Sequence, residues 1–294
     1  MRLVTRGDLD GLVSAVLITT MEKVDSLELI HPQDITDNKF PVKAGDILAN
    51  LPYHPNASLW FDHHELTDSN RKPAAGFKGK HAIAPSAARV VYEYYQAEKL
   101  KRFEPLLAET DRFDSGQLSI EDISDPKGAV LLGFTIDPRT GFGIDRDFFM
   151  TIVELFKTSA MDEVLRHPEV ARRIDIYRDN DTKCLQALKE HSRREKNVII
   201  TDFRPLSEIP PGNRFLIYMI FPAGNVSIRL QWGPQRRFIA VTLGHSIFNR
   251  TCDIDIGQLC SDYGGGGHRG AGACPLSPTT ADAKIAEIIT RLKQ

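Results

Sequence analysis

The chain has 294 residues, of which 41% are hydrophobic and 26% charged, a composition typical of a folded globular protein and not of a disordered or collagen-like one. This length is comfortable for two domains and excludes a single small module. With 37 Lys and Arg against 39 Asp and Glu, the formal net charge is −2, so composition does not indicate a surface for nucleic acid or membrane.

Targeting and redox features are those of a cytoplasmic protein. No apolar run approaches the roughly 20 residues that a membrane-spanning helix needs, and the N-terminus lacks the layout of a secretory signal. The four cysteines form no CxxC pair, which favours reduced thiols over a disulfide framework or a zinc site. They are Cys184, Cys252, Cys260 and Cys274. We therefore expect a cytoplasmic protein with no membrane partner.

The N-terminal part of the chain alternates short apolar runs with helical patterns. Its expected strands are residues 2–5, 27–30, 46–50 and 58–61, and a helix is expected at 12–23. This βαβ order predicts a mostly parallel sheet covered by helices. Further helices are expected after Pro85-Ser86, at 148–159 and at 168–191. Ligands of such folds bind at the carboxyl edge of the sheet.

After about residue 195 the pattern changes to strands, expected at 198–203, 214–221, 225–230 and 238–243. A helix is expected from about residue 280, and the polar helix 175–194 is the best linker. The sequence thus predicts an α/β fold with two lobes around a cleft. The predicted domains are an N-terminal parallel-sheet domain with its linker helix, residues 1–190, and a C-terminal α+β domain, residues 196–294.

Two acids follow the first expected strand. Asp8 and Asp10 stand on alternate residues, and Gly11 lets the chain turn sharply into the next helix. Two carboxylates this close together favour the binding of a cation. The alternative, equally weighted for this motif alone, is that one acid only caps the helix.

A carboxylate and two imidazoles follow another expected strand, as Asp62, His63 and His64. Carboxylate and imidazole together suit Mn, Fe, Zn or Mg. A lone histidine is usually structural, but here two motifs stand at matching ends of parallel strands. That coincidence favours a metal site over an incidental pair.

Two other segments carry polar residues of less specific meaning. Asp111 and Asp114 follow an apolar run and by themselves indicate an ordinary loop. Residues 264–267 are glycines followed by His268 and Arg269, and free backbone N–H groups beside a cation suit phosphate oxygens. Such a run is more often a flexible turn. Arg229, on an expected strand of the same domain, could equally be a surface residue.

The order of these motifs resembles the DHH superfamily of phosphoesterases with an appended DHHA1 domain, in its exopolyphosphatase-like and nano-RNA phosphatase-like branch. The resemblance spans nearly the whole chain. It implies a hydrolase that binds one or two divalent ions, Mn²⁺ or Mg²⁺, in a metal-binding N-terminal domain. Its relatives include single-strand exonucleases, nano-RNA phosphatases, cyclic-dinucleotide phosphodiesterases and exopolyphosphatase-like proteins.

The resemblance also implies roles for single residues. Asp62 and His64 would be catalytic, with His64 near the scissile phosphate. The implied metal ligands are Asp8, Asp10, Asn50, His63 and Asp111. The implied substrate-binding residues of the DHHA1 domain are Arg229, Gly265, Gly266 and His268, to which we add Arg269 as a further cation for the phosphate.

Two positions depart from the family pattern. Asn50 stands where the family has an Asp that bridges both ions, and a neutral amide is a poorer bridge. Many members also have a His before the first acid, where this chain has Val4 or Arg6. The remaining ligands suffice for one ion, whereas a binuclear centre would lack its bridging carboxylate.

We therefore predict a phosphoesterase in which water activated by a divalent metal attacks phosphorus and His64 acts as an acid. The acidic pI, about 6.5, favours short anionic substrates held in a cleft over a long polymer bound along a surface. Oligonucleotides, cyclic dinucleotides and polyphosphate all stay open. The alternative is a non-catalytic nucleotide-binding or phosphate-binding protein with a degenerate metal centre. The sequence does not decide the oligomeric state, and a homodimer stays open.

Overall fold

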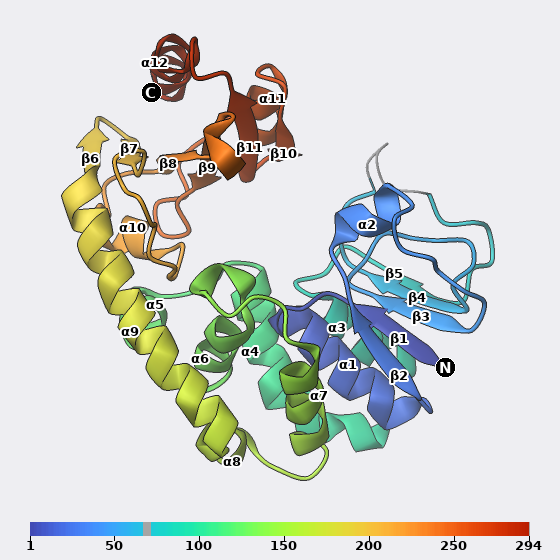
Figure 1. Ribbon diagram of the computed structural model, residues 1–294. Coiled ribbons are helices and arrows are strands. Elements are labelled where there is room, and N and C mark those ends of the chain that lie inside the picture. The colour runs from blue at the N-terminus through green and yellow to red at the C-terminus, as the bar shows by residue number, and fades with distance from the viewer. Residues whose placement is uncertain (67–71, 294) are drawn as a thin grey trace. The chain divides into compact units, whose positions relative to one another are not determined.

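The computed structural model describes residues 1–66 and 72–293, and the chain folds as two compact units (Figure 1). Unit 1 comprises Met1–Gln117 and Pro126–Arg178, and unit 2 comprises Leu118–Asp125 and Asp179–Gln294. The division falls inside the long helix α9 (Pro168–His191), whereas the sequence analysis places it after that helix. No helix among the described residues is both long and apolar enough to cross a membrane.

Unit 1 is built on a parallel sheet that has, among the described residues, five strands in the order β2-β1-β3-β4-β5. These strands are β1 (Arg2–Thr5), β2 (Ser26–Leu29), β3 (Asp46–Ala49), β4 (Leu59–Asp62) and β5 (Gly79–His81). Thr5 pairs with Ala49, which in turn pairs with Phe61, so β1, β3 and β4 end at one edge. The predicted parallel-sheet domain is confirmed, and the loops after these strands meet at its carboxyl edge.

Helices cover both faces of this sheet. Figure 1 shows α1 and α3 side by side on one face, while Ile35 of α2 joins the apolar cluster on the other. The 3-10 helices of unit 1 are η1 (Glu98–Phe103) and η2 (Pro138–Thr140). The α-helices are α1 (Leu9–Met21), α2 (Pro32–Thr36), α3 (Ala87–Tyr95), α4 (Glu104–Asp114), α6 (Gly128–Ile136), α7 (Arg146–Leu155) and α8 (Met161–Arg166).

Unit 2 contains a mixed sheet whose strands lie in the order β10-β11-β9-β8-β7-β6. They are β6 (Ser192–Glu195), β7 (Val198–Asp202), β8 (Val226–Trp232), β9 (Ile239–His245), β10 (Gly266–His268) and β11 (Ala271–Leu276). Its helices are α5 (Ile120–Ser124), α10 (Leu216–Ile220), α11 (Ile256–Ser261), α12 (Ala281–Leu292) and the 3-10 helix η3 (Pro234–Arg236). One apolar core joins the sheet to α11 and α12, which confirms the predicted α+β domain.

Three local predictions were wrong. Residues 214–221, expected as a strand, contain α10, because a short apolar run has the same composition in a buried helix and in a buried strand. The segment with Asp111 and Asp114, expected as a loop, is the last turn of α4. The linker helix ends at His191, and Ser192 begins strand β6.

Candidate metal centre and active site

The turn from β1 into α1 places two acids at the carboxyl edge of the sheet. Asp8 is the N-cap of α1, and its Oδ1 accepts a hydrogen bond of 2.9 Å from the Gly11 N–H. A side chain at Gly11 would put its Cβ 2.0 Å from the Arg6 carbonyl oxygen, so this tight turn requires glycine. Of the two acids, Asp8 is therefore the one that caps the helix, while Asp10 lies inside the first turn of the helix.

Asp10 is buried against the start of α3. Its two carboxylate oxygens accept hydrogen bonds from the Ala87 and Ala88 N–H groups, at 2.8 and 2.7 Å. These N–H groups belong to a helix N-terminus, which favours a negative charge. Burial, and then the charges of Asp114 and Asp8, nevertheless hold the pKa of Asp10 well above its usual range. A cation would relieve this cost of burying the charge.

His63 offers a nitrogen lone pair to the same place. Its Nδ1 lies 3.0 Å from the Ala84 carbonyl oxygen, which can only accept, so Nδ1 carries the ring proton and Nε2 is unprotonated. Burial, followed by the neighbouring His64, lowers the pKa of His63 and keeps the ring neutral. The buried Nε2 has no hydrogen-bond partner among the described residues, and it lies 3.6 Å from Asp10 and 3.4 Å from Asp114.

Asp114, at the end of α4, completes this group. One ligand atom from each of Asp10, His63 and Asp114 lies within 4.8 Å of the others. Burial, and then the charge of Asp8, raises the pKa of Asp114 to about 7. Two carboxylates and an unprotonated imidazole that donates its other N–H to a carbonyl are the donor set and the arrangement of a divalent-metal site. The residues present therefore fit the metal that the sequence implies.

Asp111, which the sequence analysis puts among the metal ligands, is bound elsewhere. Its Oδ1 accepts a 2.6 Å hydrogen bond from Ser86, the N-cap of α3, and its Oδ2 accepts one of 2.9 Å from Arg89 Nε. The structure puts Asp114 in its place beside His63. The signal that could have identified Asp114 is the spacing of three between the two acids, because such residues share one side of a helix.

Asn50 and Arg6 surround Asp8. Asn50 has a φ of 56°, a left-handed conformation that Asn adopts more readily than most residues. Its Nδ2 donates to Asp8 Oδ1 at 3.2 Å, and its Oδ1 is buried without a hydrogen-bond partner among the described residues. Arg6 Nε lies 3.0 Å from Asp8 Oδ2. Asp8 and Asn50 are thus beside the metal site, with Asp8 held by donors of the chain itself.

Asp62 fixes the second histidine. Its Oδ1 accepts hydrogen bonds from His64 Nδ1 at 2.8 Å and from the His63 backbone N–H at 2.9 Å. Burial alone would lower the pKa of His64, but the Asp62 carboxylate outweighs it and the net shift is upward. His64 can therefore carry a proton near neutral pH and offer it from Nε2. Asp62, expected as a catalytic residue, acts through His64 and is a positioning residue.

In unit 2, Arg229 is a half-buried cation that forms no ion pair with a carboxylate of the described residues. Its neighbours Ile228 and Leu230 belong to the core, so its side chain lies on the opposite face of β8. The guanidinium lies 4.9 Å from the centre of the Phe203 ring, and its Nε is buried without a hydrogen-bond partner in the described part of the chain. Burial lowers the pKa of Arg229. An anionic ligand would stabilise it.

The glycine-rich segment forms the edge strand β10 and its turn. A Cβ at Gly265 would lie 2.0 Å from the Ala273 carbonyl oxygen, whereas a Cβ at Gly266 would meet no atom within 4 Å. Gly265 is thus required by its packing against β11, and Gly266 is open. His268 Nδ1 accepts from the Gly270 N–H, and Arg269 donates to the Asp253 carbonyl oxygen, both at 3.2 Å.

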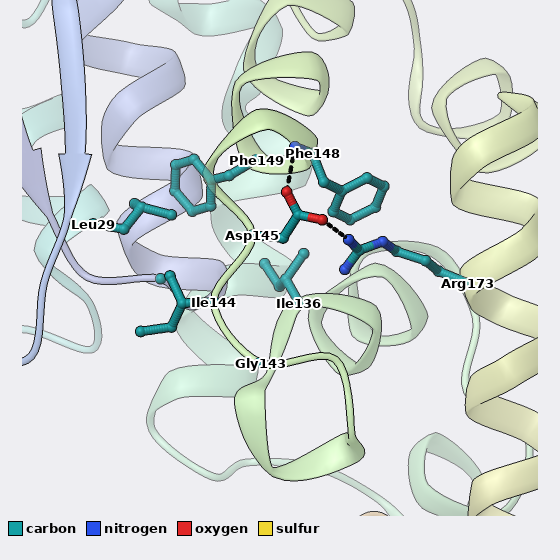
Figure 2. Close-up of a pocket in the computed structure, with 9 residues that line it drawn as sticks. Leu29, Ile136, Gly143, Ile144, Asp145, Phe148, Phe149 and Arg173 are labelled. Carbon is teal, nitrogen blue, oxygen red and sulfur yellow. Dashed lines mark hydrogen bonds and ion pairs between the residues drawn. The ribbon is translucent and has the colours of Figure 1, made fainter.

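A small cavity lies behind the β1–α1 turn of unit 1 (Figure 2). Gly7 lines it together with Phe149, and Figure 2 shows the ion pair between Asp145 and Arg173 at its edge. The Arg173 guanidinium also lies 3.7 Å from the centre of the Phe148 ring. The cavity measures about 10 Å³, room for one water molecule. It is too small to hold a nucleotide.

A solved structure that is 36% identical resembles the chain over its whole length. It is the pGpG-specific phosphodiesterase PggH from Vibrio cholerae, with a TM-score of 0.87 and coverage of 99% of this chain and 98% of that one. The chain belongs to the DHH/DHHA1 phosphoesterase family. A scan against protein-family models found no match, and neither did a search of curated proteins.

More distant structures share the DHH/DHHA1 fold. An exopolyphosphatase-related protein from Bacteroides fragilis is 12% identical with a TM-score of 0.53, and the match covers 99% of this chain and 90% of that one. RecJ from Thermus thermophilus, solved with Mn²⁺, is 13% identical with a TM-score of 0.55, and the match covers 99% of this chain and 52% of that one.

The predicted family and enzyme class are therefore confirmed. As a DHH/DHHA1 protein whose carboxyl sheet edge carries a divalent-metal donor set, the chain is a divalent-metal-dependent hydrolase of phosphoester or phosphoanhydride bonds in small anionic substrates.

Proposed function

We propose that this protein is a Mn²⁺-dependent phosphodiesterase that hydrolyses the linear guanine dinucleotide pGpG. The choice of substrate is supported by the 36% identity to PggH over nearly the full length of both chains. The observation that carries the reaction is the unprotonated, buried His63 Nε2 beside Asp10 and Asp114. Imidazole and carboxylate together suit Mn²⁺, and Mg²⁺ is the alternative.

The ligands that we propose are Asp10, His63 and Asp114. A bound divalent ion supplies electrophilic activation of water and of a phosphoryl oxygen. The chain holds its own donors rigidly, because Asp10 is fixed by two N–H groups of α3 and His63 by the Ala84 carbonyl. Neither ligand has to reorganise when the ion binds, which favours affinity.

His64 is the proposed general acid. Its Nδ1–H is held by Asp62, so the ring is oriented and Nε2 is available to donate a proton to the leaving oxygen. The raised pKa of His64 keeps that proton in place at the start of the reaction.

For the substrate's phosphates we propose Arg229, with His268, Arg269 and the open backbone at Gly266, as in the sequence analysis. The support for Arg229 is that its Nε is buried without a hydrogen-bond partner and its guanidinium forms no ion pair with any carboxylate of the described residues. A charge-assisted hydrogen bond to phosphate would supply the missing partner. Gly265, by contrast, is explained by its packing alone.

A substrate panel tests the proposal. The protein loaded with Mn²⁺ is given pGpG, the corresponding adenine dinucleotide, cyclic di-GMP and polyphosphate, and released products are measured. We expect pGpG to give two GMP, with kcat/KM at least about 100-fold above the adenine dinucleotide, since lost base contacts of roughly 3 kcal/mol correspond to that ratio. Cyclic di-GMP, which lacks the free terminal phosphate, and polyphosphate, which lacks the bases, should also be turned over more slowly than pGpG. Chelation of the metal should abolish turnover, and adding Mn²⁺ back should restore it. Equal turnover of polyphosphate, or nucleotide binding without turnover, contradicts the proposal.

A further inference from the structure

Both oxygens of the Asp8 carboxylate have partners within the chain itself. Its Oδ1 accepts from the Gly11 N–H at 2.9 Å and from Asn50 Nδ2 at 3.2 Å, and its Oδ2 forms an ion pair with Arg6 Nε at 3.0 Å. A guanidinium does not lose its proton in proteins. Asp8 is therefore paired with a permanent positive charge.

The neighbouring acids have no such partner. Within residues 1–66 and 72–293, neither Asp10 nor Asp114 forms an ion pair with an Arg or Lys, and both lie within 4 Å of the unprotonated His63 Nε2. The acidic groups at this edge thus fall into two sets. One set is balanced by Arg6, and the other has two negative charges that a single divalent ion would balance.

We propose that Arg6 takes the place of a second metal ion, so that this chain binds one divalent ion per active site. This inference rests on the proposed function only in so far as a metal binds at all. With one ion, the charges of Asp10 and Asp114 are compensated by the metal and the charge of Asp8 by Arg6. A second ion would have to displace Arg6 from Asp8 and lie near the first ion, which repels it.

Asn50 supports the same conclusion. It presents an N–H donor to Asp8, and a donor atom cannot coordinate a cation. Its other atom, Oδ1, is a neutral oxygen that can serve one ion but does not offset the repulsion between two. Neither Asp8 nor Asn50 is therefore arranged to bridge a pair of ions.

The number of bound ions tests the inference without any substrate. Mn²⁺ is bound by equilibrium dialysis to the metal-free full chain, the ions per chain are counted, and the bound Mn²⁺ is examined by electron paramagnetic resonance. We expect one ion per chain and the spectrum of an isolated Mn²⁺. Two ions per chain with an exchange-coupled spectrum would overturn the inference and leave the proposed function standing, whereas no bound ion would overturn both.

Variants test the role of Arg6 itself. The double variant Arg6→Gln with Asn50→Asp frees Asp8 and supplies a second carboxylate, so it should bind a second Mn²⁺ with at least about tenfold higher affinity than the wild type. Aspartate is compatible with the left-handed backbone at position 50. Arg2→Gln is the matched control, because Arg2 pairs with Asp46 at the opposite end of β1, and it should bind one ion as the wild type does. A double variant that folds and still binds one ion would exclude this role for Arg6, and if it does not fold, the wild-type count decides.

Discussion

His63 Nε2 and Asp114 Oδ2 lie 3.4 Å apart, and neither atom carries a proton when the acid is ionised. Two acceptors that face each other repel unless a proton or a cation lies with them. Burial and the charge of Asp8 raise the pKa of Asp114 and so favour a proton at this contact. A bound metal ion is the alternative to that proton. The contact therefore links metal affinity, protonation and fold stability in one pair of side chains.

The two acids of α4 should respond oppositely to amide substitution. Asp114→Asn removes a metal ligand, so the Kd for Mn²⁺ should rise about 10- to 100-fold and kcat should fall with it. Asp111→Asn should keep metal affinity within about threefold of the wild type. It should lower the melting temperature, because Arg89 and Ser86 lose a charged acceptor at the start of α3, at a cost of about 1–3 kcal/mol.

Isothermal titration with Mn²⁺ and thermal melts of both variants provide the measurement. Loss of metal binding in Asp111→Asn, with Asp114→Asn unaffected, would restore the ligand set that the sequence implies and exclude the one proposed from the structure.

Much of this site could be predicted from the sequence, because the chemistry lies at strand ends. Asp10 and His63 follow buried strands of a parallel sheet, and parallel strands bring their carboxyl ends together whatever the loops do. Asp114 could not be chosen over Asp111, because that choice depends on which side of α4 faces Arg89 and Ser86. The ion pair of Arg6 with Asp8 depends likewise on the tight turn at Gly11, which no residue spacing reveals.

The metal-free protein should lose stability as the pH rises towards neutrality. The pKa of Asp114 is about 7 in the folded chain and ~3.9 when unfolded, so the folded state binds more protons between these values. The contribution of Asp114 to the free energy of unfolding is complete below pH ~4 and is lost as the pH approaches about 7. Melting temperatures of chelated protein should therefore fall over this range more steeply in the wild type than in Asp114→Asn. Mn²⁺ added at pH 7.5 should restore the melting temperature of the wild type. Identical pH profiles of the melting temperature for the two proteins would contradict the raised pKa of Asp114.

Asp62→Asn should change the pH dependence of turnover without removing the metal. The carboxylate of Asp62 holds the pKa of His64 up against the effect of burial, so its loss lowers that pKa. Because a general acid is active only when protonated, the high-pH limb of the kcat profile should move to lower pH. We expect kcat to fall about 100-fold and the Mn²⁺ count to stay unchanged. A uniform loss of activity with no shift of the profile would indicate that Asp62 only supports the fold.

Gly265 and Gly266 provide a matched pair in the glycine-rich segment. Gly265→Ala should lower the melting temperature, because its Cβ would overlap the Ala273 carbonyl oxygen at 2.0 Å. Gly266→Val has open space and no positive φ, so its melting temperature should be unchanged while a side chain blocks approach of a phosphate. We expect a KM for pGpG at least about tenfold higher in Gly266→Val, equal to ~1.4 kcal/mol. An unchanged KM would mean that these glycines serve only the turn.

Arg229→Met separates binding from stability. Methionine keeps an unbranched apolar side chain but removes the guanidinium, which lies over the Phe203 ring and has no carboxylate partner in the part of the chain that the structure describes. Burying an unpaired charge costs free energy, so the ligand-free variant should be as stable as the wild type or more so. A lost charged hydrogen bond to phosphate is worth about 1.5–3 kcal/mol, so the KM for pGpG should rise about 10- to 150-fold, with the Mn²⁺ count unchanged. If Arg229 were only structural, the variant would melt at a lower temperature and keep its KM, and that pair of results would remove Arg229 from the substrate site.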